Sequence, residues 1–105
     1  MGPSRTWRTS PRRPRAHGAQ TFFDVTQAAG WRPIDAARFD YVACSSYKWL
    51  QCPRGVAFKA IRPERVDALV PHYANWYAGD DRWASIYGGP IRLASNARRF
   101  ALTDR

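Results

Sequence analysis

Short apolar runs separated by turn residues mark the chain from residue 21 onward. Runs rich in aromatic and β-branched side chains predict strands, whereas a run bounded by two prolines predicts a helix. We therefore expect strands at 21–23, 39–44 and 56–61, a helical turn at 34–38 and a helix at 63–70. The first strand is expected to be buried. This order of elements favours an α/β fold over an all-α or an all-β fold.

The pattern is weaker in the last part of the chain. Residues 73–87 are rich in aromatic side chains but show no helical or strand period, so we expect a loop there. Residues 91–103 fit a strand or a helix, and their pattern does not decide between the two. No internal repeat is visible in the sequence.

Positive charge is concentrated at the start of the chain. The 105 residues include 17 Lys and Arg against 8 Asp and Glu, which gives a net charge of +9. Five of the arginines and no acidic residue lie in residues 1–20, among prolines and glycines that favour neither helix nor strand. We interpret 1–20 as a basic, Arg/Pro-rich disordered arm that precedes a second part, 21–105. A nucleic-acid tether and a transit peptide are the functional alternatives for the arm.

Composition excludes several classes of protein. With 45% hydrophobic residues, the chain is too apolar to be disordered throughout. No apolar run approaches the roughly 18 to 20 residues of a transmembrane helix, and the Arg-rich start lacks the apolar segment of a secretory signal. The two cysteines, Cys44 and Cys52, form no redox or zinc motif. We therefore expect reduced thiols, no metal site and a cytoplasmic location.

Two chemically distinctive groups follow consecutive predicted strands. Asp24 ends the first strand, and Lys48 follows the second, before a Pro-Arg-Gly turn. Pyridoxal phosphate needs an amine to hold its aldehyde as a Schiff base, a carboxylate for its ring nitrogen and several donors for its phosphate. Asp24 and Lys48 suit the first two roles if their strands are neighbours. Each residue alone has a simpler interpretation. Asp24 could cap the following turn, and Lys48 could be a surface lysine.

The same segments resemble the class V aminotransferase and cysteine desulfurase family, whose members use pyridoxal phosphate. The matching motifs are DVTQAAGWRPID at 24–35 and SSYKWLQCPRG at 45–55, with RFDYVAC between them, and the resemblance covers roughly residues 21–100. It implies part of the large domain of a fold type I transferase, a mixed sheet with flanking helices. Tyr47 and the stretch NWYAG at 75–79 favour the kynureninase-like branch.

The resemblance also implies roles for individual residues. Lys48 would be the Schiff-base lysine and the catalytic base at the substrate's α-carbon, and Asp24 the partner of the pyridine nitrogen. Gln27 would hydrogen-bond the 3-oxygen of the cofactor. Ser45 and Tyr47 would contact its phosphate.

Complete members of this family are several times longer, so we expect the chain to be a fragment of the large domain, too short to be active alone. The family implies an amino-acid-type substrate and a homodimer. A catalytically inactive remnant remains an alternative, and a small basic nucleic-acid-binding protein ranks below it.

His17 and His72 are expected to be solvated, and the tryptophans and tyrosines to pack in a core or a dimer interface. Neither cysteine matches the sulfur carrier of the desulfurases, so we do not expect sulfur transfer.

Overall fold

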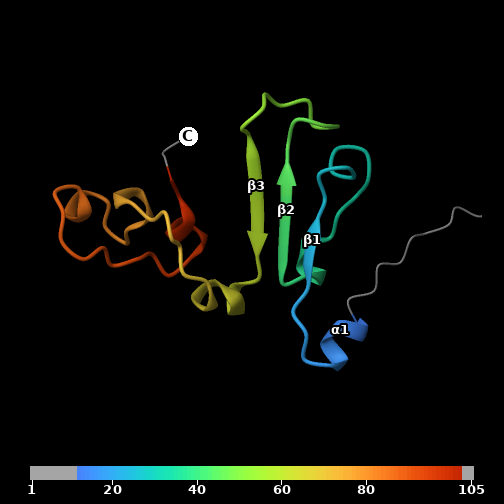
Figure 1. Cartoon of the computed structure of the whole chain (residues 1–105), viewed down its shortest axis with the longest axis horizontal. Helices are drawn as coiled ribbons and strands as arrows, with labels where there is room; N and C mark the ends of the chain where they lie inside the picture. Colours follow the sequence, from blue (N-terminus) through green and yellow to red (C-terminus); the bar gives the residue numbers. More distant parts are fainter. Residues whose placement is uncertain (1–11, 103–105) are drawn as a thin grey trace, which may run out of the picture. The chain divides into compact units, whose positions relative to one another are not determined.

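The computed structural model of the chain describes residues 12–102 (Figure 1). Within these residues it contains one short α-helix, α1 (Arg12–Ala16), and three strands, β1 (Phe22–Asp24), β2 (Tyr41–Ser45) and β3 (Ala57–Ile61). The remaining regular elements are the 3₁₀ helices η1 (Ala36–Arg38), η2 (Pro63–Ala68), η3 (Trp76–Ala78), η4 (Trp83–Ser85) and η5 (Ala97–Phe100). None of these described helices has the length and hydrophobicity needed to cross a bilayer.

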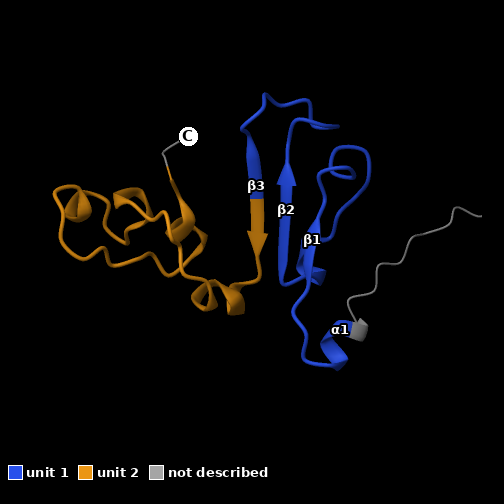
Figure 2. Ribbon diagram, in the orientation of Figure 1, with its two compact units in different colours: residues 1–58 blue, residues 59–105 orange. Residues whose placement is uncertain are grey.

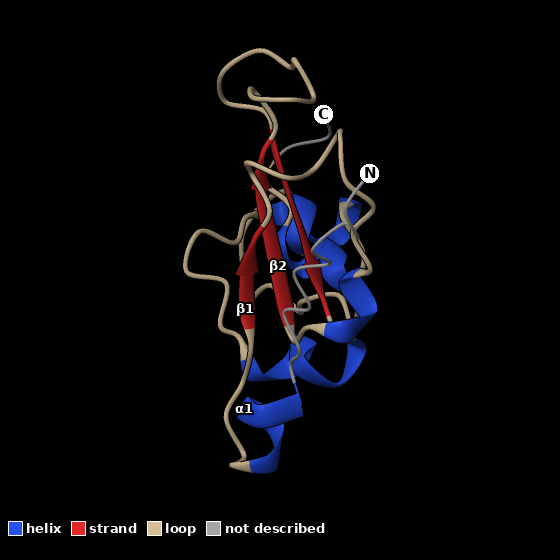
Figure 3. Cartoon of the chain, turned by 90° about the vertical axis from the view of Figure 1, so that its right-hand side faces the viewer, coloured by secondary structure: helices blue, strands red, loops and turns tan. Residues whose placement is uncertain are grey.

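The three strands form one sheet in the order β1-β2-β3. β1 and β2 are parallel, with Phe22 opposite Tyr41 and Asp24 opposite Ala43. β3 runs in the opposite direction to β2, so the sheet is mixed (Figure 1). The predicted α/β fold with a mixed sheet is therefore confirmed. Loops rather than helices extend from the carboxyl ends of β1 and β2 (Figure 3).

The predicted strands are present with shifted boundaries. Each observed strand begins one or two residues later than predicted. The predicted burial of the first strand is wrong, because Phe22 is 69% exposed. Phe22 lies opposite Tyr41, on a face of the sheet that is less covered than the face that carries Phe23 and the buried Val42.

The helix predicted at 63–70 is the 3₁₀ helix η2, which ends at Ala68. Pro63 begins it, as expected from the fixed φ of proline. Leu69 is already extended, with φ −106° and ψ 129°. Since a residue that precedes proline avoids the α region, Pro71 limits the helix from its other end. The helix therefore ends at Ala68, two residues earlier than predicted.

The segment interpreted as a disordered arm is partly helical. Residues 1–11 lie outside the described residues, and α1 follows them directly. The guanidinium of Arg15 donates to the backbone oxygen of Arg38 at 2.7 Å, which joins α1 to η1. The sequence analysis did not predict the helix α1. The division of the chain into 1–20 and 21–105 stays a prediction.

The chain divides into two compact units, residues 1–58 and 59–105 (Figure 2). The buried apolar side chains of the first unit are Val25, Ala29, Val42 and Cys44. Beside them Phe23 stacks on Phe39 with ring centroids 4.5 Å apart. Trp31 and Trp49, which were expected to pack in a core or a dimer interface, are 56% and 60% exposed in the single chain. The core of this unit is therefore small.

A buried polar pair joins the starts of β1 and β2. Thr21 donates to the Oδ2 atom of Asp40 through its backbone N–H at 2.9 Å and its hydroxyl at 2.8 Å. The N–H of Asp40 in turn donates to the hydroxyl oxygen of Thr21 at 2.9 Å. Both residues are buried, so these reciprocal bonds are shielded from competing water.

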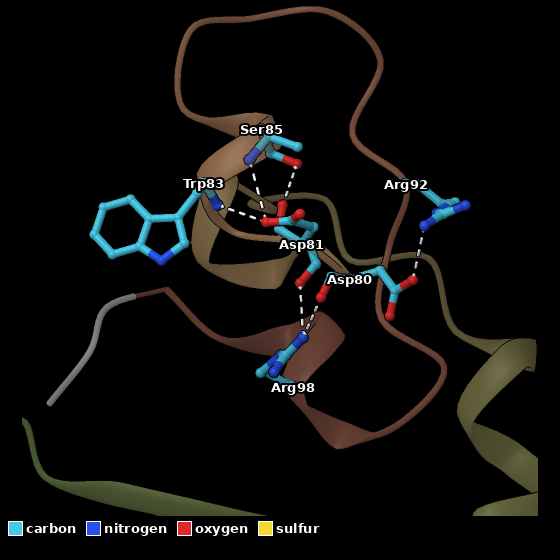
Figure 4. A network of polar contacts seen from close by, with 8 residues as sticks. Asp80, Asp81, Trp83, Ser85, Arg92 and Arg98 are labelled. Atoms are coloured by element: carbon cyan, nitrogen blue, oxygen red, sulfur yellow. Dashed lines mark hydrogen bonds and ion pairs between the residues drawn. The ribbon is translucent and has the colours of Figure 1, made fainter.

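The second unit is organised by a pairing between two loops. Gly79 forms an isolated antiparallel bridge with Leu93. Arg98 donates to the backbone oxygens of Gly79 and Asp80, at 3.1 and 2.6 Å (Figure 4). The Arg92 guanidinium pairs with the Asp80 carboxylate at 3.0 Å. Hydrogen bonds between loops, together with the buried side chains of Val66, Ala78 and Ala94, hold this unit.

The remaining predictions concern this second unit and the histidines. The loop predicted at 73–87 is irregular apart from the single turns η3 and η4. The segment 91–103, which the sequence left open, contributes one residue to the isolated bridge and then forms η5. His17 and His72 are exposed, as expected.

Candidate functional site

The first of the predicted site residues lie at the carboxyl ends of the parallel strands β1 and β2. Asp24 is the last residue of β1, and Ser45 is the last residue of β2. Because Asp24 is opposite Ala43, Ser45 extends two positions farther along the neighbouring strand. The proposed roles of Asp24 and Lys48 depend on these two strands being neighbours, and in the structure they are neighbours.

The exposed carboxylate of Asp24 is held by the turn that follows it. The backbone N–H of Thr26 donates to Oδ1 of Asp24 at 2.8 Å. The hydroxyl of Thr26, and to a smaller extent this N–H, lowers the pKa of Asp24, because both stabilise the ionised carboxylate. Asp24 therefore does cap the turn, as one interpretation of the sequence expected, and its charged form is favoured.

Thr26, which the sequence analysis did not single out, connects the two strand ends. Its hydroxyl oxygen accepts the backbone N–H of Ser45 at 2.9 Å. Thr26 thus bonds Asp24 at the end of β1 through its backbone N–H and Ser45 at the end of β2 through its hydroxyl. A threonine two positions after a strand-ending aspartate is the sequence signal for such a local turn.

Lys48 lies in a tight turn that follows β2. The N–H of Gln51 donates to the backbone oxygen of Lys48 at 3.0 Å, and the N–H of Cys52 donates to that of Ser46 at 3.0 Å. Gln51 has a φ of 55°, in the left-handed region that residues other than glycine rarely adopt. The turn is thus closed by backbone bonds, while the side chain of Lys48 is exposed.

The ring of Tyr47 lies near two cations. The Nζ atom of Lys48 is 5.2 Å from the ring centroid, and the guanidinium carbon of Arg54 is 4.8 Å from it. Arg54 belongs to the Pro-Arg-Gly turn, but the sequence analysis gave it no role. Two cations beside one aromatic ring form a positive region that suits an anion such as phosphate.

A close backbone approach joins the turn after β1 to the turn that carries Lys48. Gly30 has a φ of 105°, and a Cβ atom there would lie 3.1 Å from the backbone carbonyl carbon of Trp49. Trp31 and Trp49 lie near each other, with centroids 6.2 Å apart. Gln27 is exposed in the same loop, and its backbone oxygen accepts the indole N–H of Trp31 at 2.7 Å. The segments that carry Gln27 and Lys48 are therefore adjacent.

The structure thus brings together the segments that carry the predicted residues. Asp24 and Ser45 are joined through the backbone N–H and the hydroxyl of Thr26. Within residues 12–102, however, no hydrogen bond or ion pair links Asp24 to Lys48. The assignment of these residues to cofactor contacts stays a prediction.

Comparison with known proteins finds partial matches. No protein-family profile matches the chain. It is 38% identical over 64 residues to isopenicillin N epimerase from Streptomyces clavuligerus, covering 59% of this chain and 16% of that protein. It is 35% identical over 85 residues to the uncharacterized aminotransferase YcbU from Bacillus subtilis (strain 168), covering 79% and 21%. Isopenicillin N epimerase from Amycolatopsis lactamdurans is 36% identical over 94 residues, covering 87% and 21%.

The chain is a distant, partial homologue of these proteins. It spans only 16% to 21% of the length of the curated relatives it matches. The three-stranded mixed sheet is compatible with a fragment of a fold type I large domain. The relatives reported are epimerases and an aminotransferase, so the kynureninase-like branch that Tyr47 favoured gains no support.

Proposed function

We propose that the chain is part of a pyridoxal-phosphate-dependent enzyme of the class V aminotransferase family, acting on an amino-acid-type substrate. One observation carries the proposal: Asp24 and the segment that leads to Lys48 leave the same edge of a sheet from adjacent parallel strands. The homology to two epimerases and an aminotransferase supports it. When bound, the cofactor supplies an electron sink for negative charge that develops at the substrate's α-carbon.

The chemistry of the residues present fits this cofactor. The turn at Thr26 favours the ionised carboxylate of Asp24, which a protonated pyridine nitrogen requires as its partner. Ser45 and Tyr47 carry hydroxyl donors suited to a phosphate, and the cations beside Tyr47 supply the matching charge. Gln27 offers an amide donor to the 3-oxygen. Carboxylate, hydroxyl, amide and cationic groups are thus all available at one end of the strand pair.

Lys48 has the covalent role in this proposal. Its exposed primary amine is the group we assign to hold the aldehyde carbon of the cofactor and, once released, to move the proton at the substrate's α-carbon. The closed turn around it fixes the backbone, so the amine changes position through its own side-chain torsions. For the whole protein, we extend the proposal to a homodimer in the cytoplasm.

Reductive labelling tests the proposal with an internal competitor. The chain has two lysines, Lys48 and Lys59. Burial lowers the pKa of Lys59, which leaves more of its amine neutral and reactive at a given pH. Lys59 is therefore the internal competitor for non-specific reaction with an aldehyde. The chain is incubated with pyridoxal phosphate, reduced with borohydride and mapped by peptide mass spectrometry.

We expect the phosphopyridoxyl label on Lys48. It should vanish in the Lys48→Ala variant and persist in the matched Lys59→Ala variant. The Asp24→Asn variant should need more cofactor to reach the same labelling, because the ring nitrogen loses its anionic partner. Label confined to Lys59, or absent, would refute the proposal for this chain and favour the inactive remnant.

A further inference from the structure

A pocket of about 310 Å³ lies within the second unit (Figure 2), and none of the residues assigned to the cofactor lines it. Its apolar lining comes from the segment after η2 and from the last part of the described chain: Leu69, Val70, Pro71, Ala74, Phe100 and Leu102. Small-molecule sites typically have volumes of about 300–1,000 Å³ and mainly apolar walls. The pocket therefore has the size and the lining of a site for a small apolar group.

Two side-chain interactions tie the segments around this pocket together. The side-chain amide of Asn75 donates to the backbone oxygen of Leu102 at 2.9 Å. The guanidinium of Arg99 in η5 forms an ion pair with the carboxylate of Asp67 in η2. The 3₁₀ helix η2, the segment that follows it and the end of the described chain are therefore bonded to one another.

Lys59, on β3, supplies a cation to the lining of the pocket. Its Nζ atom lies 4.2 Å from the centroid of the Phe100 ring, which also lines the pocket. Within residues 12–102, Lys59 has no hydrogen bond or ion pair, and no acidic side chain lines the pocket. The charge of Arg99, by contrast, is paired with Asp67. Although Lys59 as a whole is exposed, partial burial of its amine lowers its pKa, as expected for a cation without an anionic partner.

We propose that this pocket binds a small carboxylate that carries an apolar group. The apolar walls hold the hydrocarbon part of the ligand, and the amine of Lys59 pairs with its carboxylate. Charge complementarity decides the class of ligand, because a neutral apolar molecule leaves the cation without a partner and a purely polar anion leaves the apolar walls in water. This inference does not depend on the proposed function, since it uses neither Asp24 nor Lys48.

Calorimetric titration of the chain with three matched probes tests both halves of the proposal. Octanoate has the carboxylate and the apolar chain, octanol lacks the charge, and acetate lacks the apolar chain. We expect octanoate to bind about tenfold more tightly than octanol, which is the gain expected from one charge-assisted contact. Acetate should show no binding. Equal affinities for octanoate and octanol, or no binding of octanoate, overturn the proposal.

Variants of the chain locate the binding. Lys59→Met removes the charge and keeps a long side chain, so octanoate should bind about tenfold more weakly while the affinity for octanol stays the same. Lys59→Arg should keep the preference for octanoate, and so should Lys48→Met, the matched control that removes the other lysine. Val70→Ser, at a position that is 74% exposed, should weaken octanoate and octanol alike. Unchanged octanoate binding in Lys59→Met or in Val70→Ser overturns the proposal, as does an equal loss in Lys48→Met.

Protection by the ligand needs no variant. Reductive methylation with formaldehyde and borohydride modifies lysine amines, and the chain has two lysines. Octanoate should slow the methylation of Lys59, because a paired carboxylate favours the protonated amine, and should leave that of Lys48 unchanged. Equal rates at Lys59 with and without octanoate contradict the proposal. A dimer that Val70→Ser dissociates, with no protection of Lys59, would assign the pocket to a second copy of the chain and overturn it.

Discussion

Replacing Thr21 by valine tests whether a buried polar pair, more than the apolar core, holds β1 against β2. Thr21 is 8% exposed and Asp40 is 3% exposed. The hydroxyl of Thr21 donates to Oδ2 of Asp40 at 2.8 Å and accepts its N–H at 2.9 Å. Valine has nearly the same shape as threonine, so this substitution removes both bonds without opening a cavity.

The magnitude follows from these two bonds. A hydrogen bond to a charged group contributes about 1.5–3 kcal/mol, and a neutral one about 0.5–1.5 kcal/mol. The added apolar group of valine regains roughly 0.8 kcal/mol on burial. We therefore expect the free energy of unfolding to fall by about 2–3 kcal/mol. With a urea m-value of about 1.5 kcal/mol/M, the midpoint falls by about 1–2 M.

Urea titration followed by tryptophan fluorescence measures this change, since the chain contains five tryptophans. Ser95→Ala, at an exposed position, is the control and should stay within about 0.5 kcal/mol of the parent chain. A double-mutant cycle with Asp40→Asn isolates the pair and should give a coupling energy of about 1 kcal/mol or more. A midpoint as close to the parent as that of the control, or a coupling near zero, would refute the reasoning.

Two further predictions concern the turn after β1. Gly30→Ala should destabilise the chain by more than about 1 kcal/mol in urea titrations, because a left-handed φ and contact with Trp49 both oppose a Cβ atom. Gly18→Ala, where φ is 69° and no atom lies within 4 Å, should cost less; an equal loss contradicts the contact argument. The folded pKa of Asp24 lies below its unfolded value, so its ionised carboxylate contributes stability at neutral pH that is lost as pH falls through the folded pKa. Urea midpoints of Asp24→Asn should therefore depend less on pH in acid than those of the parent, and parallel profiles would contradict this.

The strands could be predicted because their signal is local. The run that gives β2 alternates buried and less buried side chains, with Val42 and Cys44 inside, as a strand with one covered face requires. The exposure of Phe22 could not be predicted, since it depends on which face of the sheet the rest of the chain covers. Likewise, the sequence of η2 predicts a helix that begins at Pro63, but its pattern does not distinguish a 3₁₀ helix from an α-helix.

The candidate site shows the same division between local and long-range information. Asp24 and Lys48 attract attention because a charged group after an apolar strand is visible in the sequence. Thr26 and Arg54 do not, because their importance comes from contacts that depend on strand register and on the path of a turn. Resemblance to a family supplies roles for residues in its motifs, but not for those that support them.

The site at the end of β1 and β2 depends on hydrogen bonds more than on burial. Val25 is the largest fully buried side chain in the described residues, so apolar packing alone gives this strand pair little rigidity. A threonine hydroxyl compensates at each end: Thr21 bonds Asp40 at the start of the pair, and Thr26 bonds Ser45 at its finish. The first pair is buried and the second is exposed, so the same change to valine should have different consequences. At Thr21 it should reduce the stability of the fold, whereas at Thr26 it should mainly loosen the link between the turn after β1 and the end of β2.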